Sequence, residues 1–170
     1  MIDIRSAEEP ASLTAARELV RAHIQACSTT DDNAATERTV AALPAPYLTP
    51  SGALWVAWDG DAGVGCVALH GLTPDIAELK RMYVRPEARG RGVARRLTEH
   101  AIAIATAQGY KRLRLGTLTT MDAAQRLYTS LGFRPIAPYR PVEFGETWFY
   151  ELSLAAATAS KSAIRSSPDP

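Results

Sequence analysis

The stretch YVRPEARGRGVARRL, residues 83–97, places a short basic turn between two elements of different character. Within it, three arginines, Arg89, Arg91 and Arg95, are interspersed with two glycines, Gly90 and Gly92. The apolar segment IAELKRM precedes the stretch, and the long segment TEHAIAIATAQGY follows it. We therefore predict a strand closed by Pro86, then a glycine turn, and then a helix over residues 91–108.

A helix that begins at glycines leaves backbone N–H groups unpaired at the positive end of its dipole. Glycine lets an anion come close to the backbone, and the arginines add charge and planar donors around it. Such a turn favours phosphate groups, and a pyrophosphate in particular. The alternative for the turn taken by itself is a solvated basic helix start without a ligand.

Two common phosphate motifs do not match this turn. A dinucleotide fingerprint requires a third glycine where Arg95 stands, and an acidic residue about 20 positions after the turn. The first acidic residue beyond Glu99 is Asp122. A P-loop would need Gly-Lys-Ser/Thr, which does not follow the glycines.

Composition narrows the class of protein. The 170 residues are 46% hydrophobic with a net charge of +1, which indicates a globular protein and disfavours a nucleic-acid partner. Cys27 and Cys66 are far apart and lack metal-site spacing, so we predict no metal and a reducing, cytoplasmic location. No segment reaches the ~20 apolar residues of a membrane span. We predict one domain over residues 1–154 and a disordered tail over 155–170.

The remaining patterns give the order of the elements. Strands are predicted at 1–7, 110–118, 133–138 and 147–154, a hairpin at 53–71, and the strand before the turn at 76–86. Helices are predicted at 10–27, 34–43, 91–108 and 120–133. We expect Trp55, Trp58 and Trp148 to pack on the sheet, with an acceptor pocket lined by Trp148 and Tyr139 as the alternative. The order indicates an α+β fold with a mixed, mostly antiparallel central sheet flanked by helices.

The turn and a later motif together resemble one family. Arg89, Gly92 and Ala94 match the (Gln/Arg)-x-x-Gly-x-(Gly/Ala) acyl-CoA signature of the GNAT N-acetyltransferase superfamily. AAQRLYTSLGF, residues 123–133, is similar to the second landmark of the same superfamily. The resemblance covers roughly residues 50–152. It implies the GNAT acyl-CoA N-acyltransferase fold and acetyl-CoA as co-substrate.

The resemblance assigns cofactor contacts to three places. The strand from Ala77 to Val84 would pair with the pantetheine arm, the turn would hold the pyrophosphate, and the later helix would face the thiol end. The implied cofactor-binding residues are Met82, Tyr83, Val84, Arg89, Gly90, Arg91, Gly92, Val93, Ala94, Arg95, Ala124 and Tyr128. Met121 departs from the family, where an asparagine amide often binds the cofactor. Asp122 or the backbone would have to replace that contact.

The implied reaction is direct transfer of an acetyl group to a primary amine. The resemblance assigns Tyr128 as the general acid and Glu78 as the general base, with a water chain as the alternative base. The alternatives are a packing role for Tyr128, and a solvent-facing Glu78 paired with Lys80 or Arg81. The segment YRPVEFGETWFY, residues 139–150, occupies the place where the family shapes its acceptor end.

Two functions remain after these observations. The first is an acetyl-CoA-dependent N-acetyltransferase for an amine of a small molecule or peptide, without nucleic acid, membrane or metal. The second is a non-catalytic acyl-CoA-binding regulator with the same fold. The sequence identifies neither the acceptor nor the oligomeric state, so a homodimer stays open.

Overall fold

The computed structural model describes residues 1–28 and 32–155. The strands are β1 (Ile2–Ser6), β2 (Gly52–Asp59), β3 (Ala62–Thr73), β4 (Ile76–Val84), β5 (Arg112–Leu118), β6 (Arg134–Ile136) and β7 (Thr147–Ser153). The helices are α1 (Pro10–Cys27), α2 (Asn33–Ala42), α3 (Val93–Ala107) and α4 (Asp122–Ser130), with a 3-10 turn, η1 (Pro86–Ala88). Every predicted element is present within a few residues of its predicted bounds. The predicted tail lies, apart from Ala155, outside the described residues.

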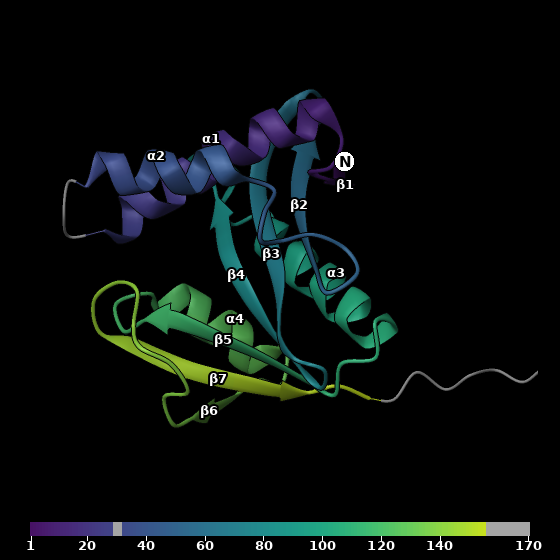
Figure 1. Cartoon of the computed structure of the whole chain (residues 1–170), viewed down its shortest axis with the longest axis vertical. Coiled ribbons are helices and arrows are strands. Elements are labelled where there is room, and N and C mark those ends of the chain that lie inside the picture. The colour runs from purple at the N-terminus through teal and green to yellow at the C-terminus, as the bar shows by residue number, and fades with distance from the viewer. Residues whose placement is uncertain (29–31, 156–170) are drawn as a thin grey trace, which may run out of the picture.

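The described strands form one seven-stranded sheet in the order β1-β2-β3-β4-β5-β7-β6 (Figure 1). Every neighbouring pair is antiparallel except β4 and β5, which run parallel. Parallel neighbours need a crossover between them, and α3 supplies it. The predicted mixed, mostly antiparallel sheet is therefore confirmed.

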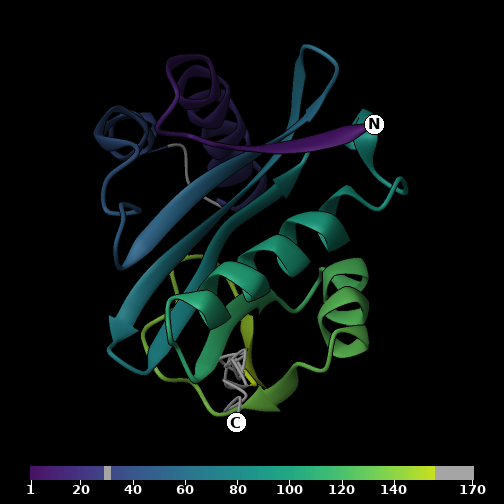
Figure 2. The same ribbon diagram turned by 90° about the vertical axis from the view of Figure 1, so that its right-hand side faces the viewer.

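The sheet buries a separate core on each of its faces, because side chains alternate along a strand. Along β2 the residues Ala53, Trp55 and Ala57 join the core beneath α3, while Leu54, Val56 and Trp58 join the core beneath α1 and α2. Figure 2 shows α3 lying across one face, with α1 on the other side of the sheet. The sheet is thus the middle layer between two layers of helices.

Helices α1 and α3 each bury one apolar face against the sheet. In α1 the buried side chains include Leu19, Val20 and Ile24, which recur at helical spacing. In α3 the buried side chains include Leu97 and Ala101, four residues apart on one face. Both helices therefore hold their place mainly through one apolar face.

The tryptophans only partly follow the prediction. Trp55 and Trp58 are buried at 7% and 8% exposure, as expected. Trp148 is 54% exposed, so the prediction that it packs on the sheet is wrong. The next two residues of β7, Phe149 and Tyr150, are both buried, so Trp148 is the exposed aromatic residue of this strand.

Candidate active site

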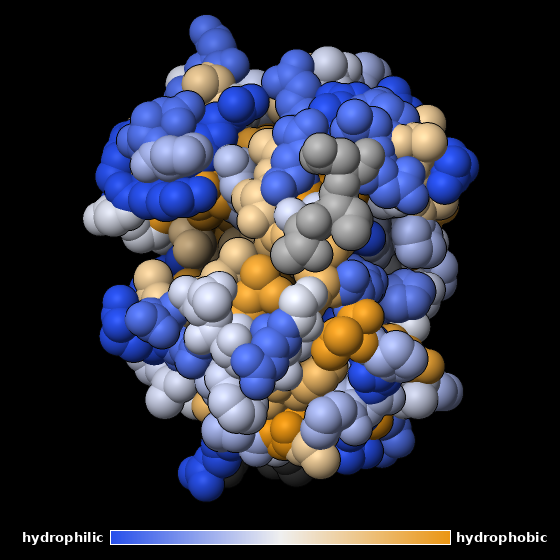
Figure 3. Space-filling view, turned by 90° about the vertical axis from the view of Figure 1, so that its left-hand side faces the viewer, coloured by the Kyte–Doolittle hydropathy of each residue, from blue (hydrophilic) through white to orange (hydrophobic). Residues whose placement is uncertain are grey.

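The site begins where β4 and β5 separate. The two strands pair only through three positions, Ile76, Ala77 and Glu78 of β4 with residues 112–114 of β5. Beyond that point β4 continues toward the glycine turn and β5 turns away from it (Figure 1). The edge of β4 from residue 79 to 84 therefore has no strand beside it on the β5 side in the described part of the chain. Figure 3 shows the side of the molecule on which the strands diverge, where apolar side chains gather in a hollow.

A bulge in β4 changes which side chains face this opening. The register with β3 shifts between Cys66 and Ala68, and Arg81 adopts a positive φ of 54°. The Cys66 thiol donates a hydrogen bond to the Arg81 carbonyl at 3.2 Å. A regular strand would turn alternate residues away, but residues 79–82 all line the pocket.

The glycine turn at the end of β4 is open. Gly90 and Gly92 have positive φ angles of 74° and 78°, a conformation that favours glycine. A Cβ atom built at either position meets nothing within 4 Å. Gly92 is the N-cap of α3, and no side chain caps the first N–H groups of the helix. The turn is thus open and carries an uncapped helix start, and its role as an anion site stays a prediction.

The three arginines of the turn lie in different directions. Arg89 donates to the Val84 carbonyl at 3.1 Å, and Arg91 contacts Asp59 at 2.6 Å. Arg95 donates to the Ser130 hydroxyl at 2.7 Å. The side chain of Arg91 is therefore directed at the β2–β3 hairpin. Because the three arginine side chains have different partners, the donors that the turn presents together are its main-chain N–H groups. Val93 is buried and Ala94 is partly buried at the start of α3.

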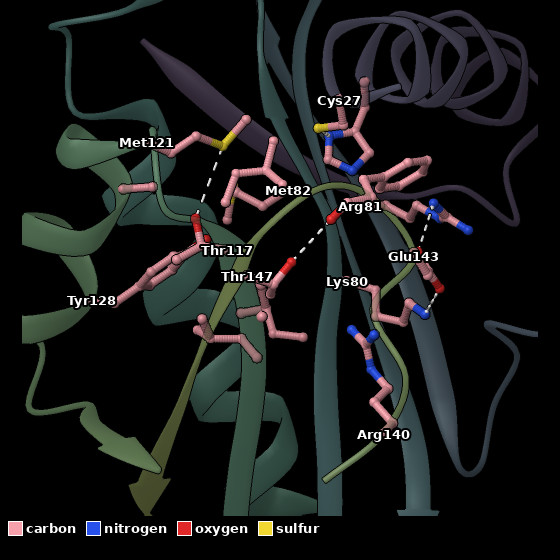
Figure 4. Close-up of a pocket in the computed structure, with 17 residues that line it drawn as sticks. Cys27, Lys80, Arg81, Met82, Thr117, Met121, Tyr128, Arg140, Glu143 and Thr147 are labelled. Carbon is pink, nitrogen blue, oxygen red and sulfur yellow. Dashed lines mark hydrogen bonds and ion pairs between the residues drawn. The ribbon is translucent and has the colours of Figure 1, made fainter. Parts of the chain in front are cut away.

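A pocket of about 110 Å³ lies between the separating strands. Its walls come from α1, β4, β5, α4 and the segment between β6 and β7 (Figure 4). Among the predicted site residues, Met82, Ala124 and Tyr128 line it. Tyr83 lies outside this lining and packs its ring against His23, with ring centroids 6.3 Å apart.

Tyr128 combines burial with access to the pocket. Its side chain is 4% exposed, and its ring contacts Phe133 edge-on at 5.6 Å. Burial raises the pKa of the Tyr128 hydroxyl well above its usual range, so the hydroxyl stays protonated at neutral pH. The hydroxyl makes no hydrogen bond within the described residues. It is therefore a proton donor without a structural partner.

Met121 stands at the N-cap of α4 and lines the same pocket. Its sulfur accepts a weak hydrogen bond from the Thr117 hydroxyl at 3.9 Å. Asp122, one of the predicted replacements for the family's asparagine, is exposed and lies outside this lining. Gln125 donates from its amide to the Leu118 carbonyl at 3.2 Å and so holds the end of β5.

Glu78 is buried rather than exposed to solvent, at 1% exposure. Its Oε1 accepts hydrogen bonds from the Tyr139 hydroxyl at 2.7 Å and from Arg140 Nε at 2.5 Å. The alternative of a solvent-facing residue paired with Lys80 or Arg81 is therefore wrong. These hydrogen bonds tie Glu78 to the segment between β6 and β7, which carries Tyr139 and Arg140. Its role as a general base stays a prediction.

A second carboxylate, Glu143, faces the pocket directly. It forms ion pairs with Lys80 and, at 3.5 Å, with Arg81 (Figure 4). Burial alone would raise the pKa of Glu143, but the hydrogen bond from Lys80 and the charge of Arg81 hold it below its usual range. Glu143 is thus ionised at neutral pH and ties the segment between β6 and β7 to β4.

His23 and Cys27 of α1 complete the wall opposite Tyr128. The His23 Nδ1 and Cys27 Sγ atoms are 3.8 Å apart. Burial, helped by the positive charge of Arg81, lowers the pKa of His23 to about 4. Burial also raises the pKa of the Cys27 thiol. Both side chains are therefore neutral at pH 7.

The depressed pKa of His23 predicts acid lability. The unfolded chain binds a proton near the ordinary pKa of 6.5, and the folded chain only near 4. Stability is therefore lost as the pH falls from about 6.5 to 4, by about 3 kcal/mol for this residue. Urea unfolding at pH 7 and pH 4 measures how much unfolding free energy the wild type and His23→Gln each lose on acidification. The loss should be smaller in His23→Gln by about 3 kcal/mol. Equal losses in the two proteins would contradict the assignment.

Several pocket residues were not predicted from the sequence. Lys80 and Arg81 belong to a predicted strand, but only the bulge turns both of them toward the pocket. His23 and Cys27 lie four residues apart on α1, and nothing in the sequence around them indicates a site. Arg140 and Glu143 do fall in the segment predicted to shape the acceptor end.

The described part of the chain contains no group of three or more His, Cys, Asp or Glu side chains that could hold a metal ion. Within residues 1–28 and 32–155, no helix has the length and apolar character needed to cross a membrane.

Comparison with known proteins gives the same family as the sequence motifs. A family model described as an acetyltransferase (GNAT) domain matches residues 50–135, half of the chain. A protein of Schizosaccharomyces pombe named as an N-acetyltransferase is 41% identical over 95 residues, covering 55% of this chain and 58% of that protein. An N-acetyltransferase of Bacillus subtilis is 35% identical over 106 residues, covering 61% of this chain and 66% of that protein.

Solved structures show the same fold. An acetyltransferase structure from Salmonella typhimurium with its cofactor acetyl-CoA has a TM-score of 0.74 and 24% identity, covering 95% of this chain and 98% of that chain. The match to each of the two curated relatives spans less than two thirds of that relative's length. The glycine turn, the separated strands and the family match agree, and the chain belongs to the GNAT acetyltransferase family. The resemblance seen in the motifs is confirmed.

Proposed function

We propose that this protein is an N-acetyltransferase that moves an acetyl group directly from acetyl-CoA to a primary amine of a small molecule or peptide. One observation carries the proposal. The unpaired edge of β4 joins an open glycine turn at one end to a pocket with a protonated tyrosine at the other. A long, thin ligand with phosphates at one end and a reactive group at the other fits this arrangement.

The described residues suit acetyl-CoA at each of these places. The N–H groups of the first turn of α3, with Arg89 and Arg95 beside them, would bind the pyrophosphate. The backbone of β4 around Met82 and Val84 would pair with the pantetheine amides, as a neighbouring strand would. Ala124 leaves space beside Tyr128 at the pocket end.

The chemistry requires two proton movements. Acetyl-CoA supplies an acetyl thioester, whose C–S bond breaks as the new C–N bond forms. The acceptor starts as an ammonium group and loses two protons in total as it becomes an amide. One proton leaves the ammonium before attack, since only a free amine is nucleophilic. The other balances the departing thiolate, and Tyr128 is placed to deliver it. Glu78 is the predicted base, and Glu143 is a pocket-facing carboxylate that the structure adds.

Release of free thiol from acetyl-CoA tests the function. We expect turnover with at least one class of amine in a panel of amino acids, polyamines and peptides, and none when the amine is omitted. Mass spectrometry of the product should show one added acetyl group on nitrogen. Tight binding of acetyl-CoA without turnover on any amine would favour the regulatory alternative instead. Absence of acetyl-CoA binding would contradict both.

A further inference from the structure

The pocket end of the cleft holds more positive than negative charge. Three cationic side chains, Lys80, Arg81 and Arg140, line it. Against them stand two carboxylates, Glu143 in the lining and Glu78 behind it. His23 adds no charge at neutral pH, because its pKa is lowered to about 4. Among the described residues around the pocket, one positive charge therefore has no carboxylate of its own.

The pairing leaves the excess charge on Lys80 and Arg81, which share one carboxylate, and it leaves a free donor on Arg140. Glu143 is shared between Lys80 and Arg81, while Glu78 binds only Arg140, through its Nε atom. The Nη1 atom of Arg140 donates to the Pro141 carbonyl at 3.0 Å. Its Nη2 atom makes no hydrogen bond within residues 1–28 and 32–155.

This free edge of Arg140 lies against the pocket wall. A Cβ atom built at Gly116 of β5 would lie 3.5 Å from Nη2, so the guanidinium approaches the backbone of that strand. The Arg140 side chain is 23% exposed, and the Glu78 carboxylate fixes its orientation. A partly buried guanidinium with one edge held and another free is suited to bind a carboxylate.

The cofactor does not explain the excess charge. Arg140 contacts Glu78, near the start of β4, and the glycine turn follows the other end of that strand. Six residues of strand separate Glu78 from Val84, about 20 Å. Phosphates held at the turn would therefore lie far from Arg140, and the thioester end of acetyl-CoA carries no charge. An anion drawn to this charge and to the free Nη2 atom of Arg140 would therefore belong to the acceptor.

We propose that the acceptor is an amine that also carries a carboxylate, an amino acid in the simplest case, and that Arg140 binds this carboxylate. The proposal rests on the proposed function and names its substrate class. Lys80 and Arg81 strengthen the positive potential of the pocket. The same charges repel polyamines and the side chains of lysine-rich peptides, which bring further positive charge.

Matched pairs of acceptors test the proposal. Thiol release is measured with several amino acids, with the carboxamide of each, and with putrescine. We expect kcat/KM to be about 10- to 100-fold higher for the acid than for its amide, the scale of a charge-assisted hydrogen bond. The amide has the more readily deprotonated amine, which works against this result. Equal or better rates for amides or putrescine would overturn the proposal while leaving the acetyltransferase function in place.

Variants assign the preference to Arg140. Arg140→Gln should bring the acid-to-amide ratio close to one without changing the affinity for acetyl-CoA, and Arg140→Lys should give an intermediate ratio. Arg112→Gln is the matched control, since Arg112 lies outside the pocket lining and its side chain is 44% exposed. That control should keep the wild-type ratio. A ratio that survives in Arg140→Gln would show that another group binds the acid.

A binding experiment separates this proposal from the proposed function. Calorimetry on the CoA-bound protein compares an N-acetyl amino acid with its carboxamide, and needs no turnover. We expect only the acid to bind, and the double variant Glu78→Gln with Arg140→Gln to lose it without leaving a buried charge unpaired. If no amine is acetylated yet the acid binds, the function fails and the carboxylate site stands. If acid and amide bind equally, the carboxylate site fails.

Discussion

Replacing Tyr128 with phenylalanine is expected to lower kcat by ~10²-fold or more, the usual scale for a positioned acid. The substitution removes one hydroxyl and keeps the buried ring against Phe133. The hydroxyl has no hydrogen-bond partner within the described residues, so stability should hardly change. The affinity for acetyl-CoA should also change little, because a proton delivered to the thiolate matters only in the transition state. Steady-state kinetics with the best acceptor measures both quantities.

Tyr110→Phe is the matched control for this substitution. The Tyr110 hydroxyl is buried outside the pocket and donates to the Ser51 carbonyl at 2.8 Å. Its loss should cost about 1 kcal/mol of stability and leave kcat unchanged. An activated thioester with a better leaving group should restore part of the rate in Tyr128→Phe, because it needs the acid less. Full activity of Tyr128→Phe with acetyl-CoA would reduce Tyr128 to a packing residue.

Gly92→Glu is expected to abolish acetyl-CoA binding, with Kd rising ~10²-fold or more, equivalent to about 3 kcal/mol. The new side chain would occupy the open space in front of the α3 N-terminus and place a negative charge where the pyrophosphate is proposed to bind. Isothermal calorimetry measures the affinity, and circular dichroism checks the fold. Unchanged affinity would remove the glycine turn from the cofactor site.

Two control variants separate charge from backbone strain. Gly92→Ala introduces the same backbone strain at a positive φ as Gly92→Glu, about 1 kcal/mol, but adds no charge. It should therefore weaken acetyl-CoA binding far less than Gly92→Glu does. Gly109→Glu puts the same charge at another glycine of positive φ, 88°, at the opposite end of α3. The helix separates the two positions by about 22 Å. Gly109→Glu should therefore bind acetyl-CoA as the wild type does. A similar loss in all three variants would indicate a general effect on folding.

The sequence predicted the elements well because their patterns are local. Pro10 at the start of α1 and the stripe of Leu19, Val20 and Ile24 are read within one helix. The glycine start of α3 follows from two residues whose φ angles only glycine adopts readily. The exposure of Trp148 does not follow from such a pattern, since the next two residues of β7, Phe149 and Tyr150, are both buried.

What the sequence determined by itself is the order of strands and helices, the glycine turn and the family to which both motifs point. Only the tertiary structure decided which charges meet at the pocket. Glu78 and Arg140 are 62 residues apart in the chain, and Lys80 and Glu143 are 63 apart. Their contacts depend on the sheet order that sets β5 between β4 and β7, and on the bulge at Arg81. No local periodicity encodes such contacts, because they arise only when distant strands pack side by side.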